Sequence, residues 1–240
     1  MLKPALAVLM LAGASFAAHA TDFVEGKHYT QVTNKASDSP KVTEYFSFYC
    51  PHCYNMSTKY LNFIKAKIDP SIKFDDAHVD FMNSSIGTEV MRSLAVMKTL
   101  GVEKELLPKM FAAIQGDNAG AHDHSHPHQS GINSRDDIKQ VFATAGIDAA
   151  KYDEVADSSE TTDTINSWRQ EQTTYQVESI PTFIVNDKYR INMDEIRSVA
   201  DLTELIDYLA TKKEEKSGGS MGWLFLAFAG LAAVSRRRYS

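Results

Sequence analysis

The strongest constraint on this chain is a short stretch that holds both of its cysteines. A β-branched and aromatic run begins at Val42 and ends abruptly at Cys50, after which the sequence reads Cys50-Pro51-His52-Cys53. Proline suits the first position of a helix, because its missing N–H would have no intrahelical partner there. The stretch therefore predicts a strand, a turn at Cys50 and a helix that begins at Pro51.

This placement predicts redox chemistry at Cys50. The unpaired N–H groups and the positive dipole end of a helix N-terminus stabilise an anion, and the thiolate is the species that attacks and leaves in disulfide exchange. His52 can add a positive or hydrogen-bonding group beside Cys50. A disulfide between Cys50 and Cys53 would therefore be easily reduced by a substrate. The ring that it closes is so small that it would stabilise the fold little.

Metal binding is the alternative for these cysteines, because Cys-x-x-Cys is also a metal-ligand spacing. A structural zinc site usually needs a second pair of ligands, and the chain has no second cysteine pair. Segment 116–131 is rich in histidine, and its alternate histidines are of a kind that binds zinc, copper or nickel: His122, His124, His126 and His128. Their spacing is not that of a closed site, so we favour a solvated insertion, with a metal-binding protein as the alternative function.

The first twenty residues predict export. Residues 1–20 contain Lys3, an apolar run and the small-residue sequence Ala18-His19-Ala20, the pattern of a signal peptide cleaved after Ala20. A membrane anchor is the alternative, but the apolar run is short. The mature protein is thus expected in an oxidising compartment.

The last 24 residues, 217–240, contain a second apolar run. Gly218 and Gly219 precede an apolar stretch, Trp223–Val234, and the arginines at 236–238 follow it. The stretch is short against a hydrocarbon core of about 30 Å. A permanent anchor is one reading of this tail. The other is a resemblance to a GlyGly-CTERM sorting signal, cut near Gly218–Ser220 by a rhomboid-type protease.

The remaining pattern predicts an α/β fold. The helix after Cys50 is expected to stop at Pro70, and a strand over Ile72–Phe81 would complete a β-α-β unit. Several helices follow, one of them with Ser134 as its expected N-cap. Val177–Arg190 returns to strand character, with Asn186-Asp187 as the turn of a two-stranded hairpin, before a last helix capped by Asp201. We expect Phe23–Pro40 to be an extended lead-in. Hydrophobic residues make up 43% and charged residues 23% of the chain, as in ordinary globular proteins. The net charge of −6 argues against a nucleic-acid partner.

Four runs together resemble the DsbA family of periplasmic thiol:disulfide oxidoreductases, and the resemblance extends from about Phe23 to Lys213. The runs are Glu44–Tyr54, His78–Met82, Ala145–Ile147 and Ile180–Asn186. The resemblance implies a thioredoxin-like fold with an inserted helical domain. We place the thioredoxin-like domain at 21–83 and 169–216 and the insertion at 84–168.

The resemblance also implies roles for individual residues. Cys50 would be the exposed nucleophile and Cys53 its buried partner, with no cofactor beyond their disulfide. The Ile180–Pro181 bond would be cis and face the disulfide, and Ile180 would pair with an extended substrate. Glu44 matches a buried acid below the disulfide. A lysine that usually pairs with this acid falls at Asp76, so Glu44 is expected to lack its partner.

The function implied is that of a dithiol oxidase for newly exported, reduced polypeptides. A membrane reoxidase resembling DsbB would restore its disulfide. A disulfide reductase or isomerase is the alternative within redox chemistry. It is disfavoured because the chain has no separate dimerisation domain and because histidine follows proline in the Cys50–Cys53 motif.

Overall fold

A five-stranded mixed sheet, with strands in the order β1-β5-β4-β2-β3, forms the base of the fold. The computed structural model describes residues 22–81, 85–116 and 130–212. The strands are β1 (Tyr29–Gln31), β2 (Lys41–Phe46), β3 (Lys73–His78), β4 (Thr182–Val185) and β5 (Tyr189–Ile191). Only β2 and β3 are parallel; the other neighbours are antiparallel. The thioredoxin-like α/β class is thereby confirmed.

Strand β1 was not expected, because residues 23–40 were predicted to be only an extended lead-in. It pairs with β5, and Tyr29 lies opposite Ile191. Tyr29 is buried against Tyr189, with 5.6 Å between the ring centroids. A three-residue edge strand carries too little alternation to be recognised from sequence, and its position depends on this long-range aromatic contact.

The predicted hairpin is confirmed at β4 and β5. Asn186 and Asp187 both have positive φ, of 53° and 57°, in the turn Asn186–Lys188 that separates the paired residues Val185 and Tyr189. Asparagine and aspartate tolerate this left-handed conformation. The Asn186 side chain accepts a hydrogen bond from the Lys41 N–H at 3.0 Å, and so ties the turn to the start of β2.

The helix that follows Cys50 has three parts. It begins as α1 (Pro51–Asn55), widens into a π-helical segment, η1 (Met56–Tyr60), and ends as α2 (Leu61–Lys67). The prediction of a helix running from Pro51 toward Pro70 is confirmed in outline, but the π segment was not foreseen. Such segments occur frequently at functional sites, and this one begins three residues after Cys53.

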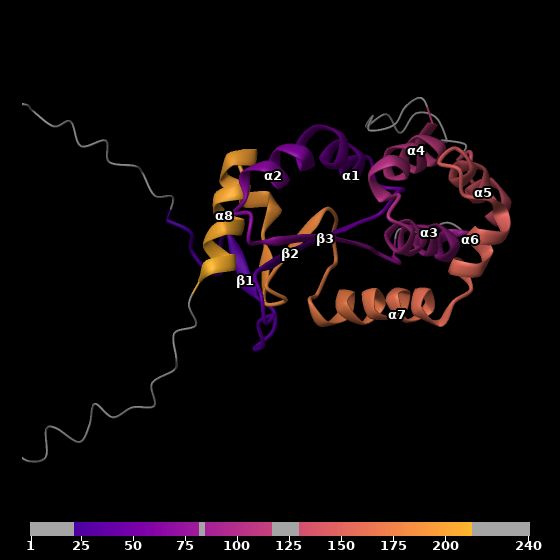
Figure 1. Cartoon of the computed structure of the whole chain (residues 1–240). Helices are drawn as coiled ribbons and strands as arrows, with labels where there is room; N and C mark the ends of the chain where they lie inside the picture. The colour runs from indigo at the N-terminus through magenta and orange to yellow at the C-terminus, as the bar shows by residue number, and fades with distance from the viewer. Residues whose placement is uncertain (1–21, 82–84, 117–129, 213–240) are drawn as a thin grey trace, which may run out of the picture. The chain divides into compact units, whose positions relative to one another are not determined.

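In the described residues between β3 and β4, the inserted region consists of five helices: α3 (Gly87–Leu100), α4 (Glu103–Gln115), α5 (Arg135–Ala143), α6 (Ala149–Ala156) and α7 (Ser159–Thr174). Figure 1 shows α4, α5, α6 and α7 arranged around α3. The predicted N-cap at Ser134 is confirmed as a capping box with Asp137. The boundary placed at residue 168 falls inside α7, and the domain bounds as a whole stay predictions.

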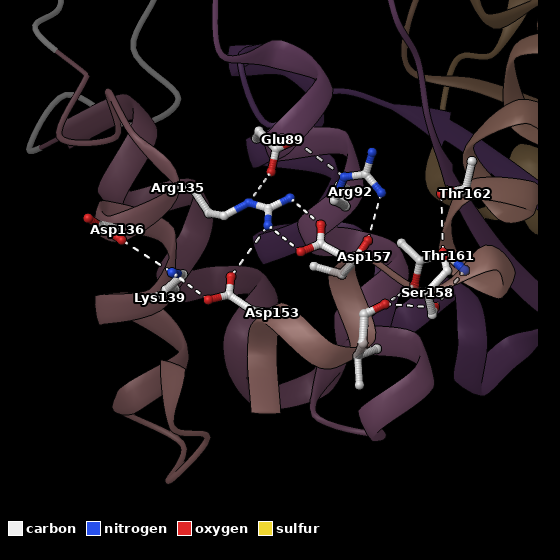
Figure 2. A network of polar contacts seen from close by, with 12 residues as sticks. Glu89, Arg92, Arg135, Asp136, Lys139, Asp153, Asp157, Ser158, Thr161 and Thr162 are labelled. Atoms are coloured by element: carbon white, nitrogen blue, oxygen red, sulfur yellow. Dashed lines mark hydrogen bonds and ion pairs between the residues drawn. The ribbon is translucent and has the colours of Figure 1, made fainter. Parts of the chain in front are cut away.

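A network of charges joins α3, α5 and α6 (Figure 2). Arg135 lies at its centre: its Nε donates to Glu89 at 2.7 Å, and its two Nη atoms donate to Asp157 at 2.8 and 2.9 Å. Lys139 contacts Asp153 at 2.7 Å, and Arg92 donates to the Ala156 carbonyl at 2.7 Å. Because these groups share partners, the network stabilises the inserted region more than isolated surface pairs would.

The last helix, α8 (Val199–Thr211), covers the same face of the sheet as α2. The prediction that Asp201 caps it is wrong. The hydroxyl of Ser198 accepts the Asp201 N–H at 3.1 Å, so Asp201 lies in the first turn. Serine and aspartate both make good N-caps, and the sequence pattern alone did not separate them.

Candidate active site

Cys50 lies at the junction between the end of β2 and the start of α1. It is the N-cap residue, with extended backbone angles of −95° and 116°, and Pro51 takes the first helical position. The Cys50 N–H donates to the Ser47 carbonyl, and the Cys50 carbonyl accepts from the Tyr54 N–H, each at 3.0 Å. The predicted strand, turn and helix are therefore confirmed.

The two cysteines are free thiols in this structure and stand one helical turn apart. The Cys53 N–H donates to the Cys50 sulfur at 3.3 Å. Cys50 and Cys53 are 2% and 1% exposed. Cys50 was expected to be the exposed member, and its near-complete burial in this state differs from that expectation.

Their surroundings move the two thiol pKa values in opposite directions. A hydrogen bond from the Cys53 side chain, followed by bonds from the backbone N–H groups of Cys53 and His52, lowers the pKa of Cys50 to about 7 despite its burial. Burial raises the pKa of Cys53 well above its usual value, and the neighbouring Cys50 adds to this effect. The arrangement stabilises a thiolate at Cys50 and a neutral thiol at Cys53.

His52 lies between the two sulfurs in sequence, but its side chain is exposed. The contact that lowers the pKa of Cys50 comes from the backbone N–H of His52. A contribution of its imidazole ring stays a prediction.

The Ile180–Pro181 segment faces the first cysteine. This peptide bond is cis, as the resemblance implied. The Ile180 carbonyl lies 3.8 Å from the Cys50 sulfur, which is within reach of a weak bond from the thiol. Ile180 is half-buried and packs against the core. The structure thus brings together Cys50, Cys53 and Ile180 from distant parts of the chain.

Two buried polar residues hold the backbone just before Cys50. His78 accepts the Phe48 N–H on Nε2 at 3.1 Å and contacts the Val79 carbonyl through Nδ1 at 2.7 Å, so Nδ1 carries the proton. Burial lowers the pKa of His78 to about 4, which keeps the ring neutral. Gln115 donates to the Phe48 and Cys50 carbonyls at 2.8 and 3.1 Å. Neither role was predicted from the sequence.

A cavity of about 600 Å³ opens behind Cys53. Residues from the Cys50 helix, the sheet and α4 line it, among them Cys53, Glu44, Asp76, Lys65, Glu103 and Phe111. Glu44 is 2% exposed, and its Oε1 has no hydrogen-bond partner within the described residues. Burial first, and then the negative charge of Asp76, raise the pKa of Glu44 well above its usual value.

A lysine from an unexpected element supplies positive charge to this cavity. Lys65 on α2 lies with its Nζ 3.8 Å from Asp76 Oδ2 and 4.3 Å from the centre of the Phe74 ring. Its charge opposes the rise of the Glu44 pKa. Glu44 therefore lacks the family lysine, as expected, but it does not lack a cationic neighbour. The signal was the spacing of Lys65 four residues after the buried Leu61, on the same side of the helix.

Comparison with known proteins agrees with this geometry. The profile of the family described as "DSBA-like thioredoxin domain" matches residues 41–206. The thiol:disulfide interchange protein DsbA of Pectobacterium carotovorum is 30% identical over 207 residues, which cover 83% of this chain and 94% of that protein.

The chain belongs to the DsbA family.

As a member of the DsbA family, the protein is a thiol:disulfide oxidase. The Escherichia coli K12 DsbA protein is likewise 30% identical over 217 residues, covering 87% of this chain and 97% of that protein. The crystal structure of the disulfide oxidoreductase DsbA from Proteus mirabilis shares 30% identity at a TM-score of 0.66 and covers 80% of this chain and 98% of its own. A structure of DsbA from the same organism with a bound peptide has a TM-score of 0.69 at 29% identity.

Three further predictions fall wholly or partly outside the described residues: the signal peptide, the His-rich loop and the C-terminal tail. Across residues 22–81, 85–116 and 130–212, no group of three or more histidine, cysteine or acidic side chains is arranged to hold a metal ion. In that same part of this DsbA-family chain, none of the helices has the length and apolar character needed to span a membrane.

Proposed function

We propose that this protein transfers a Cys50–Cys53 disulfide to reduced polypeptides that have just been exported. The observation that carries the proposal is the opposite shift of the two thiol pKa values, about 7 for Cys50 and a raised value for Cys53. A thiol with a low pKa is a good leaving group in disulfide exchange. Reduction of the disulfide is thereby favoured, which is what a donor of disulfides requires.

The reaction follows from the two environments. A substrate thiolate attacks the Cys50 sulfur, the Cys50–Cys53 bond breaks, and the Cys53 sulfur leaves and takes up a proton, because its buried site disfavours the charge. A second substrate thiolate then attacks the substrate sulfur of the mixed disulfide. The substrate disulfide forms and Cys50 leaves as a thiolate, stabilised by the N–H groups at the start of α1. Glu44, beside Cys53 in the cavity, is the proposed carrier of the Cys53 proton.

The substrate segment would lie against Ile180 and Pro181. The Ile180 carbonyl is already within 3.8 Å of the Cys50 sulfur, so an extended peptide that pairs with the Ile180 backbone would bring its own cysteine to Cys50. This is a form of strand addition. The Proteus mirabilis relative has been solved with the non-covalently bound peptide PWATCDS, which contains a cysteine.

A membrane partner resembling DsbB would reoxidise the two cysteines, and no cofactor besides their disulfide is proposed. The reduction potential of the Cys50–Cys53 pair against glutathione tests the direction of the reaction. We expect a value less negative than about −230 mV, the lower limit for glutaredoxins. A value near that of thioredoxin, about −270 mV, would instead indicate a reductase.

We place the mature protein in the periplasm after removal of residues 1–20. The C-terminal segment 217–240 would be a sorting signal that is cleaved near Gly218–Ser220, or else a membrane tether. Intact-mass measurement of the protein from its native host decides between the two. A C-terminus that still carries Arg238 would rule out cleavage.

The metal-binding alternative has its own test. Deleting residues 121–129 removes the four clustered histidines, His122, His124, His126 and His128. If the loop binds zinc or copper, calorimetric titration with the metal should lose its signal while oxidation of a dithiol peptide continues. Loss of peptide oxidation on deletion would instead tie the loop to catalysis.

A further inference from the structure

Four acidic or thiol side chains in the cavity form a series of increasing exposure. Cys53 and Glu44 are 1% and 2% exposed. The side chains of Asp76 and Glu103 are 6% and 29% exposed. All four line the same cavity of about 600 Å³. The cavity therefore connects the buried sulfur to water through three carboxyl groups.

The sheet register and the start of α4 bring these carboxyl groups together. Glu44 lies directly opposite Asp76 in the parallel pair of β2 and β3, so both side chains project from the same face. The Glu103 side chain, in the first turn of α4, is hydrogen-bonded to Asp76. Two carboxyl groups can share a hydrogen bond only if one of them holds a proton.

We propose that Asp76 and Glu103 form the outer part of a proton path that links Cys53, through Glu44, to solvent. The inference deepens the proposed function, since it concerns the same cysteine pair. Asp76 and Glu103 act through Glu44 and are positioning residues for the proton, not catalytic ones. The helical insertion thus contributes Glu103 to the chemistry of the thioredoxin-like half.

The path serves the step in which the disulfide is rebuilt. The Cys53 thiol gives its proton to the Glu44 carboxylate. The Cys53 thiolate then attacks the Cys50 sulfur of the mixed disulfide, the Cys50–Cys53 bond forms, and the partner sulfur leaves as a thiolate. Glu44 passes the proton to the pair of Asp76 and Glu103, from which it reaches water.

The charges around Glu103 suit this exchange. Lys98 on α3 lies 3.9 Å from Glu103 Oε2 and 2.5 Å from Asp75 on β3, and Lys65 faces the pair from α2. Lys104 lines the cavity next to Glu103 on α4. Burial raises the pKa of Glu103 to about 7, with the hydrogen bond to Asp76 and its negative charge adding to the rise and Lys98 and Lys65 opposing it. At neutral pH the group can therefore both accept and donate a proton.

Ring closure in the mixed disulfide of Cys50 with glutathione tests the path, because it isolates the Cys53 step. Release of glutathione is followed by acid quench and mass spectrometry between pH 5 and 9. We expect Glu103→Gln to slow release about tenfold near pH 7, less than the loss of a direct general base causes, with the difference vanishing at high pH. Formate or imidazole, small enough for the cavity, should restore the rate. Asp76→Asn should behave in the same way.

Glu105→Gln is the matched control, because Glu105 lies on the same helix, is 53% exposed at its side chain and pairs with Lys109. Its release rate and pH profile should equal those of the unmodified protein. The proposal is overturned if Glu103→Gln and Asp76→Asn both match the control, or if their slow release is insensitive to formate and imidazole, as a purely structural defect would be. Oxidation of a dithiol peptide by the unmodified protein is measured separately. If the unmodified protein does not oxidise the dithiol peptide, the proposed function is contradicted. The rate of glutathione release still tests the proton path on its own.

Discussion

The two sides of the Cys50–Cys53 pair differ in how they are built. On the Cys50 side, backbone N–H groups at the start of α1 and the Ile180 carbonyl meet the sulfur. On the Cys53 side, carboxyl groups and Lys65 surround a cavity between the sheet, the active-site helix and α4. The first side consists mostly of backbone groups and stabilises a negative charge. The second consists of side chains and stores a proton.

This difference decides what each side contributes to the reaction. The thiolate at Cys50 is stabilised first by a hydrogen bond from the Cys53 side chain and then by fixed backbone N–H donors, which the start of a helix provides. The proton at Cys53 needs groups that titrate, and these come from β2, β3, α2 and α4. Two sulfurs one helical turn apart thus acquire different roles from their contact with each other and from their different surroundings.

Among the variants that test the difference between the two sulfurs, replacement of either cysteine should change the oxidase reaction most. Cys50→Ser removes the attacked sulfur and should abolish oxidation of a dithiol peptide. Cys53→Ser removes only the buried partner and should let mixed disulfides with the peptide accumulate, visible by non-reducing electrophoresis. If both variants failed in the same way, the assignment of distinct roles would be wrong.

Ionisation of Cys50 should also make the free energy of unfolding of the reduced protein depend on pH. Its pKa falls from 9.0 to about 7 on folding, so between these pH values the unfolded chain holds a proton that the folded chain has lost. Stability must therefore rise with pH across this window, by at most about 2–3 kcal/mol, and this gain is lost as the pH falls through 7.

Denaturant unfolding of the reduced protein at pH 7 and pH 9 measures this effect, with Cys50→Ser as the control. The control should show a clearly smaller increase over the same range. Equal increases in both proteins would mean that another group titrates.

On the Cys53 side, Glu44→Leu should raise stability while it slows ring closure. The Glu44 carboxyl is buried with Oε1 unsatisfied among the described residues, and such a group costs about 1–3 kcal/mol. Because the pKa of Glu44 is raised on folding, the unmodified protein loses stability as the pH rises above 4.5. The difference in the free energy of unfolding between Glu44→Leu and the unmodified protein, measured by urea unfolding, should therefore increase from pH 4 to pH 7. A variant less stable at pH 7 would show that Glu44 helps to hold the fold.

The smallest expected change concerns Lys65. Lys65→Met removes a positive charge that lowers the pKa of Glu44, so the pH profile of ring closure should move upward. Lys65 is 40% exposed at its side chain and is partly screened by solvent, so the shift should be only about a few tenths of a pH unit. Lys59→Met on the exposed π segment serves as the control. A shift of the ring-closure pH profile to lower pH would contradict the conclusion that Lys65 lowers the pKa of Glu44.

Local patterns in the sequence were sufficient for the Cys50 side. The run into Cys50 and the proline after it predict the strand, turn and helix, and the Asn186-Asp187 pair predicts the hairpin; both are confirmed. These features depend on residues close in sequence, where helix and turn preferences act.

The Cys53 side could not be predicted in the same way. Lys65 reaches the cavity from α2, and Glu103 reaches it from α4 in the insertion. Packing of these two helices against the sheet brings both side chains to Glu44. The π segment was also missed, because no glycine or proline in Met56–Tyr60 marks it. The contact of Glu103 with a strand far away in sequence leaves no periodic signal in the chain, whereas the spacing of Lys65 from Leu61 on α2 does.

The central claim is that the two sulfurs have pKa values displaced in opposite directions. Alkylation of the reduced protein with iodoacetamide over pH 5–10, with each cysteine quantified by peptide mass spectrometry, tests it directly. The account predicts that Cys50 reacts with a midpoint near pH 7 and that Cys53 stays almost unreactive up to pH 9. Two equal profiles with midpoints near pH 8.5, the value of a free thiol, would contradict it.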